Sequence, residues 1–160
     1  MGIAEEEALT MDKETEQLRQ VVADVLERFA FSFVDDEEQR GQDTDWLQAD
    51  LAFAGPVQGA VSLALPRELA FELGLSILGV DPGSASAELA EDAVKELTNI
   101  ICGELLYRLH GAQAVFNLGV PALRAVADDE AVEQAMPPAA PAVRLSVEGR
   151  SVKAWLSAVA

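Results

Sequence analysis

Two neighbouring segments alternate apolar and polar residues, and this pattern restricts the fold more than any other feature of the sequence. In the first segment, residues 46–54, the side chains that would share one face are Leu47, Ala49, Leu51 and Phe53. In the second, residues 57–65, they are Val57, Val61, Leu63 and Leu65. Gly55 and Pro56 lie between the segments and are typical turn residues. The pattern predicts a β-hairpin with one apolar face, which other elements must cover.

Three segments with helical spacing are candidates to cover that face. Apolar residues recur at intervals of three and four over residues 13–34, and the acidic run at 35–38 would end this helix and start a loop. A second helix is expected over residues 66–78, because proline is tolerated in the first turn of a helix. The third is expected over residues 87–110, with Gly111 as the typical residue after a helix end.

The rest of the chain is expected to add strands to the sheet. Residues 114–120 predict a strand that Pro121 stops, and residues 127–141 predict a loop with a helical turn. Residues 142–159 predict two alternating strands joined around Gly149. Strands with one apolar face and tight turns favour an antiparallel sheet. The predicted fold class is therefore α+β, with two layers and an antiparallel sheet packed by helices on one face.

The chain is long enough for one ordinary domain. Residues 1–12 are predicted to form a flexible tail, and residues 13–160 a single domain. Ala60, Ala64 and Trp155 fall on the strand face opposite the apolar one. Because that face is less polar than a solvated sheet surface would be, a second copy of the chain or another partner is expected to cover part of it.

Composition excludes several classes of function. The formal net charge of −17 opposes binding to nucleic acid or to an anionic membrane surface. Cys102 is the only cysteine and His110 the only histidine, so neither an internal disulfide nor a zinc site of the usual type is expected. No stretch approaches the roughly 20 apolar residues of a membrane span. The acidic start lacks the features of a signal peptide, and a cytoplasmic protein is expected.

The helix expected over residues 87–110 carries a polar stripe on one face. Helical spacing brings into one line, away from the apolar side of the helix, the four residues Asp92, Glu96, Asn99 and Gly103. Glycine inside a helix costs about 1 kcal/mol against alanine, but it lets another surface approach closely. Ile100 and Tyr107 flank the stripe, and their bulk there would suit a docking interface.

Pattern alone leaves two interpretations of the stripe open. Every surface helix has a solvated face on which Glu, Asp and Asn are ordinary residues, so plain exposure is one interpretation. The other is a surface that binds or reacts. The spacing resembles neither a metal cluster nor a nucleophile–base pair. Two carboxylates along one helix face are also poorly placed for glycoside hydrolysis, which needs them on opposite sides of a bond.

The sequence resembles the CheC/CheX/FliY family of chemotaxis phosphatases. That family's signature is Asp or Ser, three residues, Glu, two residues, Asn, and a proline about 22 positions further on. Asp92, Glu96 and Asn99 match this spacing, and Pro121 follows at the expected distance. The stretches "ELTNIICGELL" and "NLGVPAL" also resemble the family's helix and strand end. The order of elements matches from about residue 13 onward, and the single motif helix is similar to that of CheX-like members.

The resemblance implies a phosphatase that acts on the aspartyl phosphate of a CheY-like response regulator. Glu96 would form a salt bridge with a lysine of the regulator and fix the docking register. Asn99 would orient the attacking water, because a side-chain amide offers both donors and an acceptor. Such positioning is what phosphoryl transfer chiefly requires.

The same resemblance implies supporting roles for other residues. The partner-binding surface would comprise Asp92, Glu96, Asn99, Ile100, Gly103 and Tyr107. Pro121 would be structural and shape the loop near the motif. No cofactor and no metal site are expected on this chain, since Mg²⁺ would belong to the active site of the phosphorylated regulator. CheX-like members form dimers through their sheets, which makes a homodimer a candidate.

Two other functions are weighed against the phosphatase. One is a non-catalytic CheX-like module that docks a regulator or another signalling protein. Glu96 and Asn99 together favour the enzyme, because a pure binder has no use for an amide at the water-positioning site. The other is an unrelated α+β domain whose helix matches the motif by chance.

Overall fold

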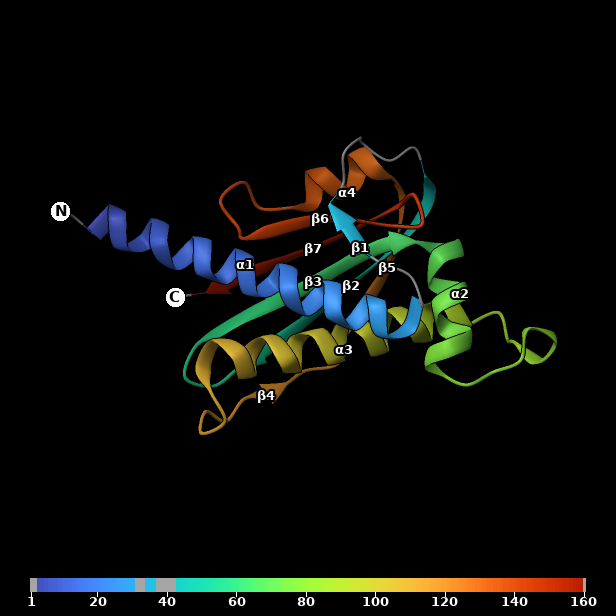
Figure 1. The fold of residues 1–160 in the computed structure, drawn as a ribbon, viewed down its shortest axis with the longest axis horizontal. Coiled ribbons are helices and arrows are strands. Elements are labelled where there is room, and N and C mark those ends of the chain that lie inside the picture. The colour runs from blue at the N-terminus through green and yellow to red at the C-terminus, as the bar shows by residue number, and fades with distance from the viewer. Residues whose placement is uncertain (1–2, 31–33, 37–42, 160) are drawn as a thin grey trace.

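The computed structural model describes residues 3–30, 34–36 and 43–159, and within them a two-layer α+β fold (Figure 1). The elements in chain order are α1 (Ile3–Ala30), β1 (Val34–Asp36), β2 (Thr44–Ala54), β3 (Gln58–Pro66), α2 (Arg67–Ile77), the short 3₁₀ helix η1 (Pro82–Ser84), α3 (Leu89–His110), β4 (Asn117–Leu118), β5 (Ala122–Asp128), α4 (Asp129–Ala135), β6 (Ala142–Val147) and β7 (Arg150–Val159). The described strands form one sheet in the order β1-β6-β7-β3-β2-β4, with β5 also paired to β2.

The predicted hairpin is confirmed as β2 and β3, which occupy the middle of the sheet. The antiparallel register sets Leu47 opposite Leu65 and Leu51 opposite Val61, so the apolar side chains of both strands lie on one face and are buried. Val57 is the exception, since it precedes β3 and is exposed in the turn. Every described strand pair is antiparallel, as predicted.

Three helices cover the apolar face. α2 and α3 lie within one or two residues of the predicted ranges. α1 begins at Ile3 rather than at residue 13, and its first turns project past the sheet (Figure 1). Residues 3–12 contain neither glycine nor proline, so local propensity extends the helix on the N-terminal side of Leu18, the first buried residue among the α1 side chains that the structure describes. The division into a tail at 1–12 and a domain at 13–160 stays a prediction.

The first helix also ends earlier than predicted. It stops at Ala30, and Val34 belongs instead to β1, where it pairs with Val147 of β6. The acidic run predicted as a loop is therefore partly strand, since Asp35 and Asp36 lie in β1. The remainder of that predicted loop, residues 37–38, lies outside the described residues.

The strand predicted over residues 114–120 is shorter, and a further strand follows it. β4 covers only Asn117 and Leu118, and β5 begins directly after Pro121. Both pair with β2, along the edge opposite β3. Sequence reasoning missed β5 because every one of its side chains is at least partly exposed at this edge, so it lacks a clear apolar alternation.

The opposite face of the sheet carries α4, whereas helices were expected on one face only. Val132 and Met136 pack there against Trp46, Ala64 and Trp155. The helical turn predicted within residues 127–141 is thus confirmed as α4. The low polarity of this face, inferred from Ala64 and Trp155, is explained in part by the chain's own helix rather than by a partner.

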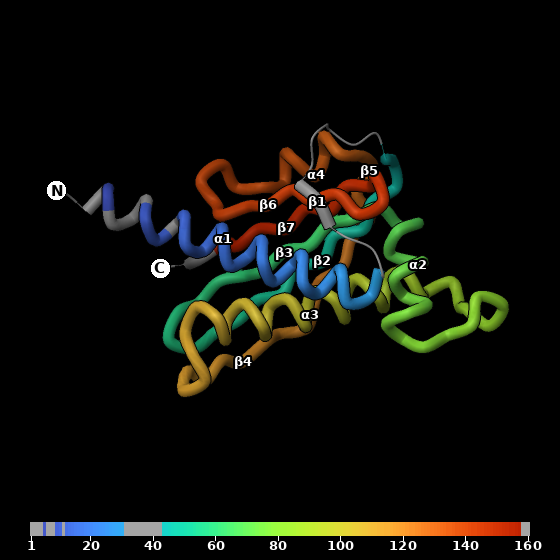
Figure 2. The backbone as a smooth tube through the Cα atoms, viewed as in Figure 1, coloured from blue at the N-terminus to red at the C-terminus, as the bar shows by residue number. Residues whose placement is uncertain are grey.

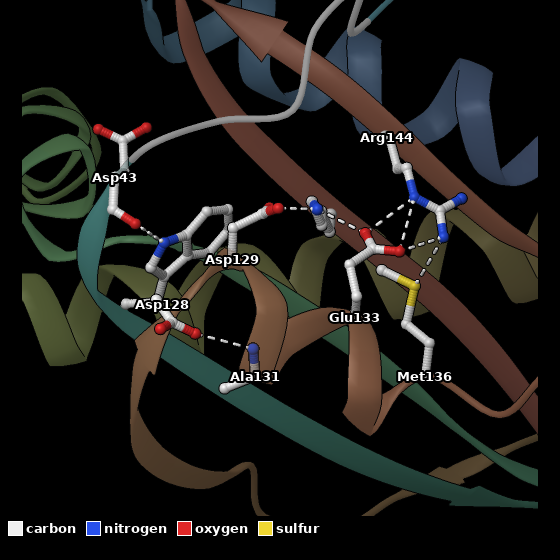
Figure 3. Close-up of polar contacts among 9 residues, drawn as sticks. Asp43, Asp128, Asp129, Ala131, Glu133, Met136 and Arg144 are labelled. Atoms are coloured by element: carbon white, nitrogen blue, oxygen red, sulfur yellow. Dashed lines mark hydrogen bonds and ion pairs between the residues drawn. The ribbon is translucent and has the colours of Figure 1, made fainter.

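Charged side chains fasten α4 to the sheet (Figure 3). Lys153 of β7 is only 1 % exposed and forms ion pairs with Asp129 and Glu133 of α4. Arg144 donates hydrogen bonds to Glu133 at 2.6–3.2 Å. The Lys153 ammonium also lies 5.8 Å from the centroid of the Trp46 ring, where a cation is attracted to the ring face.

Candidate functional site

α3 is a rigid support for the predicted site, because its inner face is embedded in the core. Its buried residues include Ala90, Val94, Leu97, Ile101 and Leu105. The helix ends at Gly111, whose φ of 84° suits glycine and whose amide donates to the Tyr107 carbonyl at 2.8 Å.

Neighbouring helices hold α3 in place. An added Cβ at Gly74 of α2 would lie 3.0 Å from Leu89 Cγ and 3.1 Å from Ala93 Cβ, so the two helices approach closely. On the other side, Arg28 and Asp24 of α1 form ion pairs with Glu104 and Arg108 of α3, at 3.0 and 2.9 Å. α1 and α3 accordingly lie side by side (Figure 2). The helix that bears the predicted site is fixed on both flanks.

The motif stripe, defined as Asp92, Glu96, Asn99 and Gly103, lies on the outward face of α3. Asp92, Glu96 and Gly103 are exposed, and Asn99 is half-buried. Within the described residues, the side chains of Asp92, Glu96 and Asn99 have no hydrogen bond or ion pair. The stripe therefore presents two carboxylates and an amide that are all available to another molecule.

The carboxylates beside the stripe are different, because they are already paired. Glu91 lies 3.6 Å from Arg67, which also contacts Asp45. Glu104 is bound by Arg28. An incoming cation could thus meet Glu96 and Asp92 without displacing an arginine of the described residues. Asp92 stands in the first turn of α3, where a negative charge also interacts favourably with the helix dipole.

The polar and reactive groups on the inner side of α3 are satisfied or inert. The Thr98 hydroxyl donates to the Val94 carbonyl at 2.6 Å, inside the turn that carries Glu96 and Asn99. Cys102 is fully buried, and burial raises the pKa of its thiol to about 12. Cys102 is therefore a thiol at neutral pH and offers no nucleophile.

Beyond the stripe, the surface opens into a hollow that the sequence did not predict. The α3 pocket, as we call it, has a volume of about 210 Å³ and is lined chiefly by Gly103, Leu106, Tyr107, Ala112, Ala114 and Phe116. An added Cβ at Gly103 would meet no described atom within 4 Å, and Tyr107 is 63 % exposed. The sequence signal that could have indicated an exposed apolar surface here was the apolar run after α3, in which Val115 and Val120 are exposed.

The structure brings most, though not all, of the predicted site residues together. Asp92, Glu96, Asn99, Gly103 and Tyr107 follow one another along a single face of α3. Ile100 flanks them but is half-buried and packs against the core.

Pro121 lies elsewhere, between β4 and β5 at the edge of the sheet. Next to it, the Gly119 amide donates to the Ala52 carbonyl of β2 at 2.8 Å. Its position is that of a residue that starts a strand.

The described residues offer neither a metal cluster nor a membrane-spanning helix. In the part of the chain that the structure describes, no three His, Cys, Asp or Glu side chains gather as a metal site. None of the described helices is long and apolar enough to cross a membrane.

Comparison with known proteins gives one family and one fold. The family model described as chemotaxis phosphatase CheX matches residues 48–136, more than half of the chain and a range that contains the motif stripe and Pro121. A search of curated proteins found no match.

Several solved structures share the fold. The chemotaxis protein CheX from Vibrio vulnificus superposes with a TM-score of 0.66 at 15% identity, covering 90% of this chain and 95% of that one. A CheC-like superfamily protein from Shewanella sp. PV-4 gives 0.66 at 16% identity, with 92% and 97% covered. A CheX-CheY-BeF3-Mg complex from Borrelia burgdorferi gives 0.57 at 16% identity, with 91% and 97% covered. At these identities the similarity shows a CheC-like fold.

Proposed function

The chain belongs to the family of the chemotaxis phosphatase CheX, and we propose that it hydrolyses the aspartyl phosphate of a CheY-like response regulator in the cytoplasm. The observation that carries this proposal is the outward face of α3. There Glu96 and Asn99 are accessible and have no partner among the described residues. A charged anchor and a positioning amide on one rigid helix face are the two groups that such a reaction asks of this protein.

Glu96 is proposed as the anchor for a lysine beside the regulator's phosphoryl group. It is exposed on α3, where Glu91 and Glu104 are already paired with arginines, whereas Asp92 has no partner among the described residues. An exposed ion pair contributes about 0–1 kcal/mol, but a pair that becomes desolvated in an interface can contribute more. Glu96 would therefore fix the docking register as well as add affinity.

Asn99 is proposed to hold the attacking water in line with the phosphorus. It follows Glu96 by three residues, so it lies on the same face and about 4.5 Å further along the helix axis. Its amide can accept from the water and also donate to it or to a phosphoryl oxygen. The water forms the new P–O bond while the bond to the regulator's aspartate breaks, and no group of this chain becomes covalently attached.

The fold neighbour from Borrelia burgdorferi supports the class of partner, because it is a complex of CheX with CheY. We propose the same class of partner here. The Mg²⁺ expected beside the phosphoryl group would be held by the regulator, and no residue of this chain is assigned to it. Asp92 and Tyr107 would contribute to the contact surface on either side of the reacting pair.

Phosphate release tests the proposal. CheY-like regulators from the same organism would be phosphorylated with a small phosphodonor and Mg²⁺, freed of the donor, and followed with wild-type protein and variants. Asn99→Ala should keep regulator binding and lose hydrolysis, whereas Glu96→Ala should lose both. Gln113→Ala, which removes another exposed amide, is the control and should act as wild type. Full activity of Asn99→Ala would refute the mechanism, and binding without hydrolysis by the wild type would indicate a docking module.

We also propose that the chain forms a homodimer through the part of the outer sheet face that α4 leaves uncovered. Ala52 and Ala122 are exposed there, and Ala60 is half-buried. These small side chains would let a second sheet approach closely. Sedimentation at micromolar concentration should give twice the monomer mass, and a monomer would remove the proposal.

A further inference from the structure

The α3 pocket begins where the motif stripe ends. Gly103 belongs to both, since it is the last residue of the stripe and part of the pocket lining. It lies one helical turn beyond Asn99, about 6 Å along the axis, and Tyr107 lies about 12 Å beyond. A typical protein interface buries about 800 Å² on each partner, equivalent to a disc of about 16 Å radius. A protein centred on Asn99 would therefore cover the pocket as well.

The chemistry of the pocket favours an apolar occupant. Its walls consist of glycine, alanine, leucine and phenylalanine, with Tyr107 as the one lining residue that has a polar side-chain atom. The volume of about 210 Å³ exceeds that of the roughly 150 Å³ engineered cavity that accommodates benzene in another protein. One large aliphatic or aromatic side chain would fit.

The absence of carboxylates from the pocket lining also favours a regulator over other partners. No aspartate or glutamate occurs from residue 105 to residue 127, although the chain has 28 acidic residues in all. The last turn of α3 carries Arg108, which is paired with Asp24, and His110. The aspartate that a regulator phosphorylates and the carboxylates that hold its Mg²⁺ make its docking face acidic, and an acidic face is repelled least where carboxylates are absent. The pocket is thus a part of this acidic chain that repels such a face least.

From these observations we infer that the α3 pocket receives an apolar side chain from the docking face of the regulator and so selects among regulators. The inference rests on the proposed function for the identity of the partner, but not on hydrolysis. Glu96 and Asn99 would engage groups that all phosphorylated regulators share, namely the lysine and the phosphoryl group. The α3 pocket would instead contact a side chain that differs from one regulator to another.

The test compares variants that alter the pocket with variants that alter its rim. Ala114→Leu fills the pocket, and Gln113→Leu adds the same side chain at an exposed neighbour that does not line it. Ala112→Asp places a carboxylate in the pocket, and Gln113→Asp places the same charge beside it. Ala112 is exposed, so its substitution leaves the core intact, and thermal unfolding of all four variants checks this.

Binding is measured by titration with CheY-like regulators loaded with beryllofluoride and Mg²⁺, which imitate the phosphorylated state. Ala114→Leu and Ala112→Asp should each raise Kd about tenfold or more over the matched Gln113 variant, the size expected when one large apolar side chain loses its site. Equal Kd values for the pocket variants and their controls would overturn the inference.

The two proposals fail in different ways. If regulators bind, and the pocket variants weaken binding, but the wild type releases no phosphate, the inference stands and the phosphatase proposal fails. If Asn99→Ala abolishes hydrolysis while the pocket variants bind normally, the phosphatase proposal stands and the inference fails. If no regulator binds the wild type, both are overturned.

Discussion

Gly103→Ala should make the protein more stable and at the same time weaken its binding to the proposed regulator. Glycine in a helix interior costs about 1 kcal/mol relative to alanine. The new methyl group would meet no described atom within 4 Å, so no packing strain offsets this gain. For a domain of this size, about 1 kcal/mol corresponds to a rise in Tm of about 2–4 °C.

The expected loss of binding follows from the same open space beside Gly103, which the regulator would occupy. If the regulator packs on the bare backbone at Gly103, a methyl group overfills a close contact, which costs about 1–3 kcal/mol in packed interiors. That cost amounts to a rise of about fivefold or more in Kd. Hydrolysis at saturating regulator should change little, because Glu96 and Asn99 are unaltered.

The assay combines thermal unfolding with titration by a beryllofluoride-loaded regulator. Gly83→Ala is the matched control, since an added Cβ there also meets no described atom within 4 Å but the residue lies in η1, outside α3. It should leave Kd unchanged. A Gly103→Ala protein that is stabilised yet binds with the wild-type Kd would refute the close-approach role of this glycine. A Gly103→Ala protein that is less stable than wild type would refute the claim that the space beside Gly103 is open.

Three further predictions concern stability and reactivity. Lys153→Met should lower the free energy of unfolding by about 3–5 kcal/mol in urea titrations, because it leaves Asp129 and Glu133 without the buried cation between them. The hydrogen bond from Arg144, and to a lesser degree that from Lys153, lowers the pKa of Glu133 from 4.5 to about 2. The ionised Glu133 therefore stabilises the folded protein fully above pH 4.5, and this stabilisation is lost as the pH falls toward 2. Arg144→Gln should therefore be less stable than wild type at neutral pH, with a difference that shrinks over that acid range; a constant difference would contradict this. The Cys102 thiol should react with an alkylating reagent at neutral pH only as fast as the protein opens, and rapid labelling of the native state would show that it is accessible.

Periodicity in the sequence predicted the helices and strands that bury many apolar side chains. The β2–β3 hairpin and α3 follow from repeats in which most buried positions are apolar, such as Leu47, Leu51 and Ile101. β1 escaped prediction because two of its three residues are aspartates and its pairing partner, Val147, is more than a hundred residues away. Lys153 falls on the polar side of its strand by alternation, and only the return of α4 across that face buries it.

The candidate site likewise has one part that the sequence could predict and one part that it could not. The motif stripe could be predicted because a single helix brings its residues together, and spacing alone defines a helix face. The α3 pocket could not, because it forms between α3 and a segment without regular periodicity, including Ala112 and Phe116. Its shape depends on the strand β4 pairing with Phe53 and Ala54 of β2, a long-range contact that no local pattern reports.

The sheet separates the charged residues under α4 from the proposed site on α3. Lys153, Asp129 and Glu133 lie between α4 and one face of the sheet, whereas Glu96 lies on the outward side of a helix packed against the other face. Substitutions at distant residues that share no partner usually have additive effects on stability. A lineage of such proteins could therefore change what it binds by altering the outward face of α3, and could adapt to heat or acid by altering the other side, without either history constraining the other.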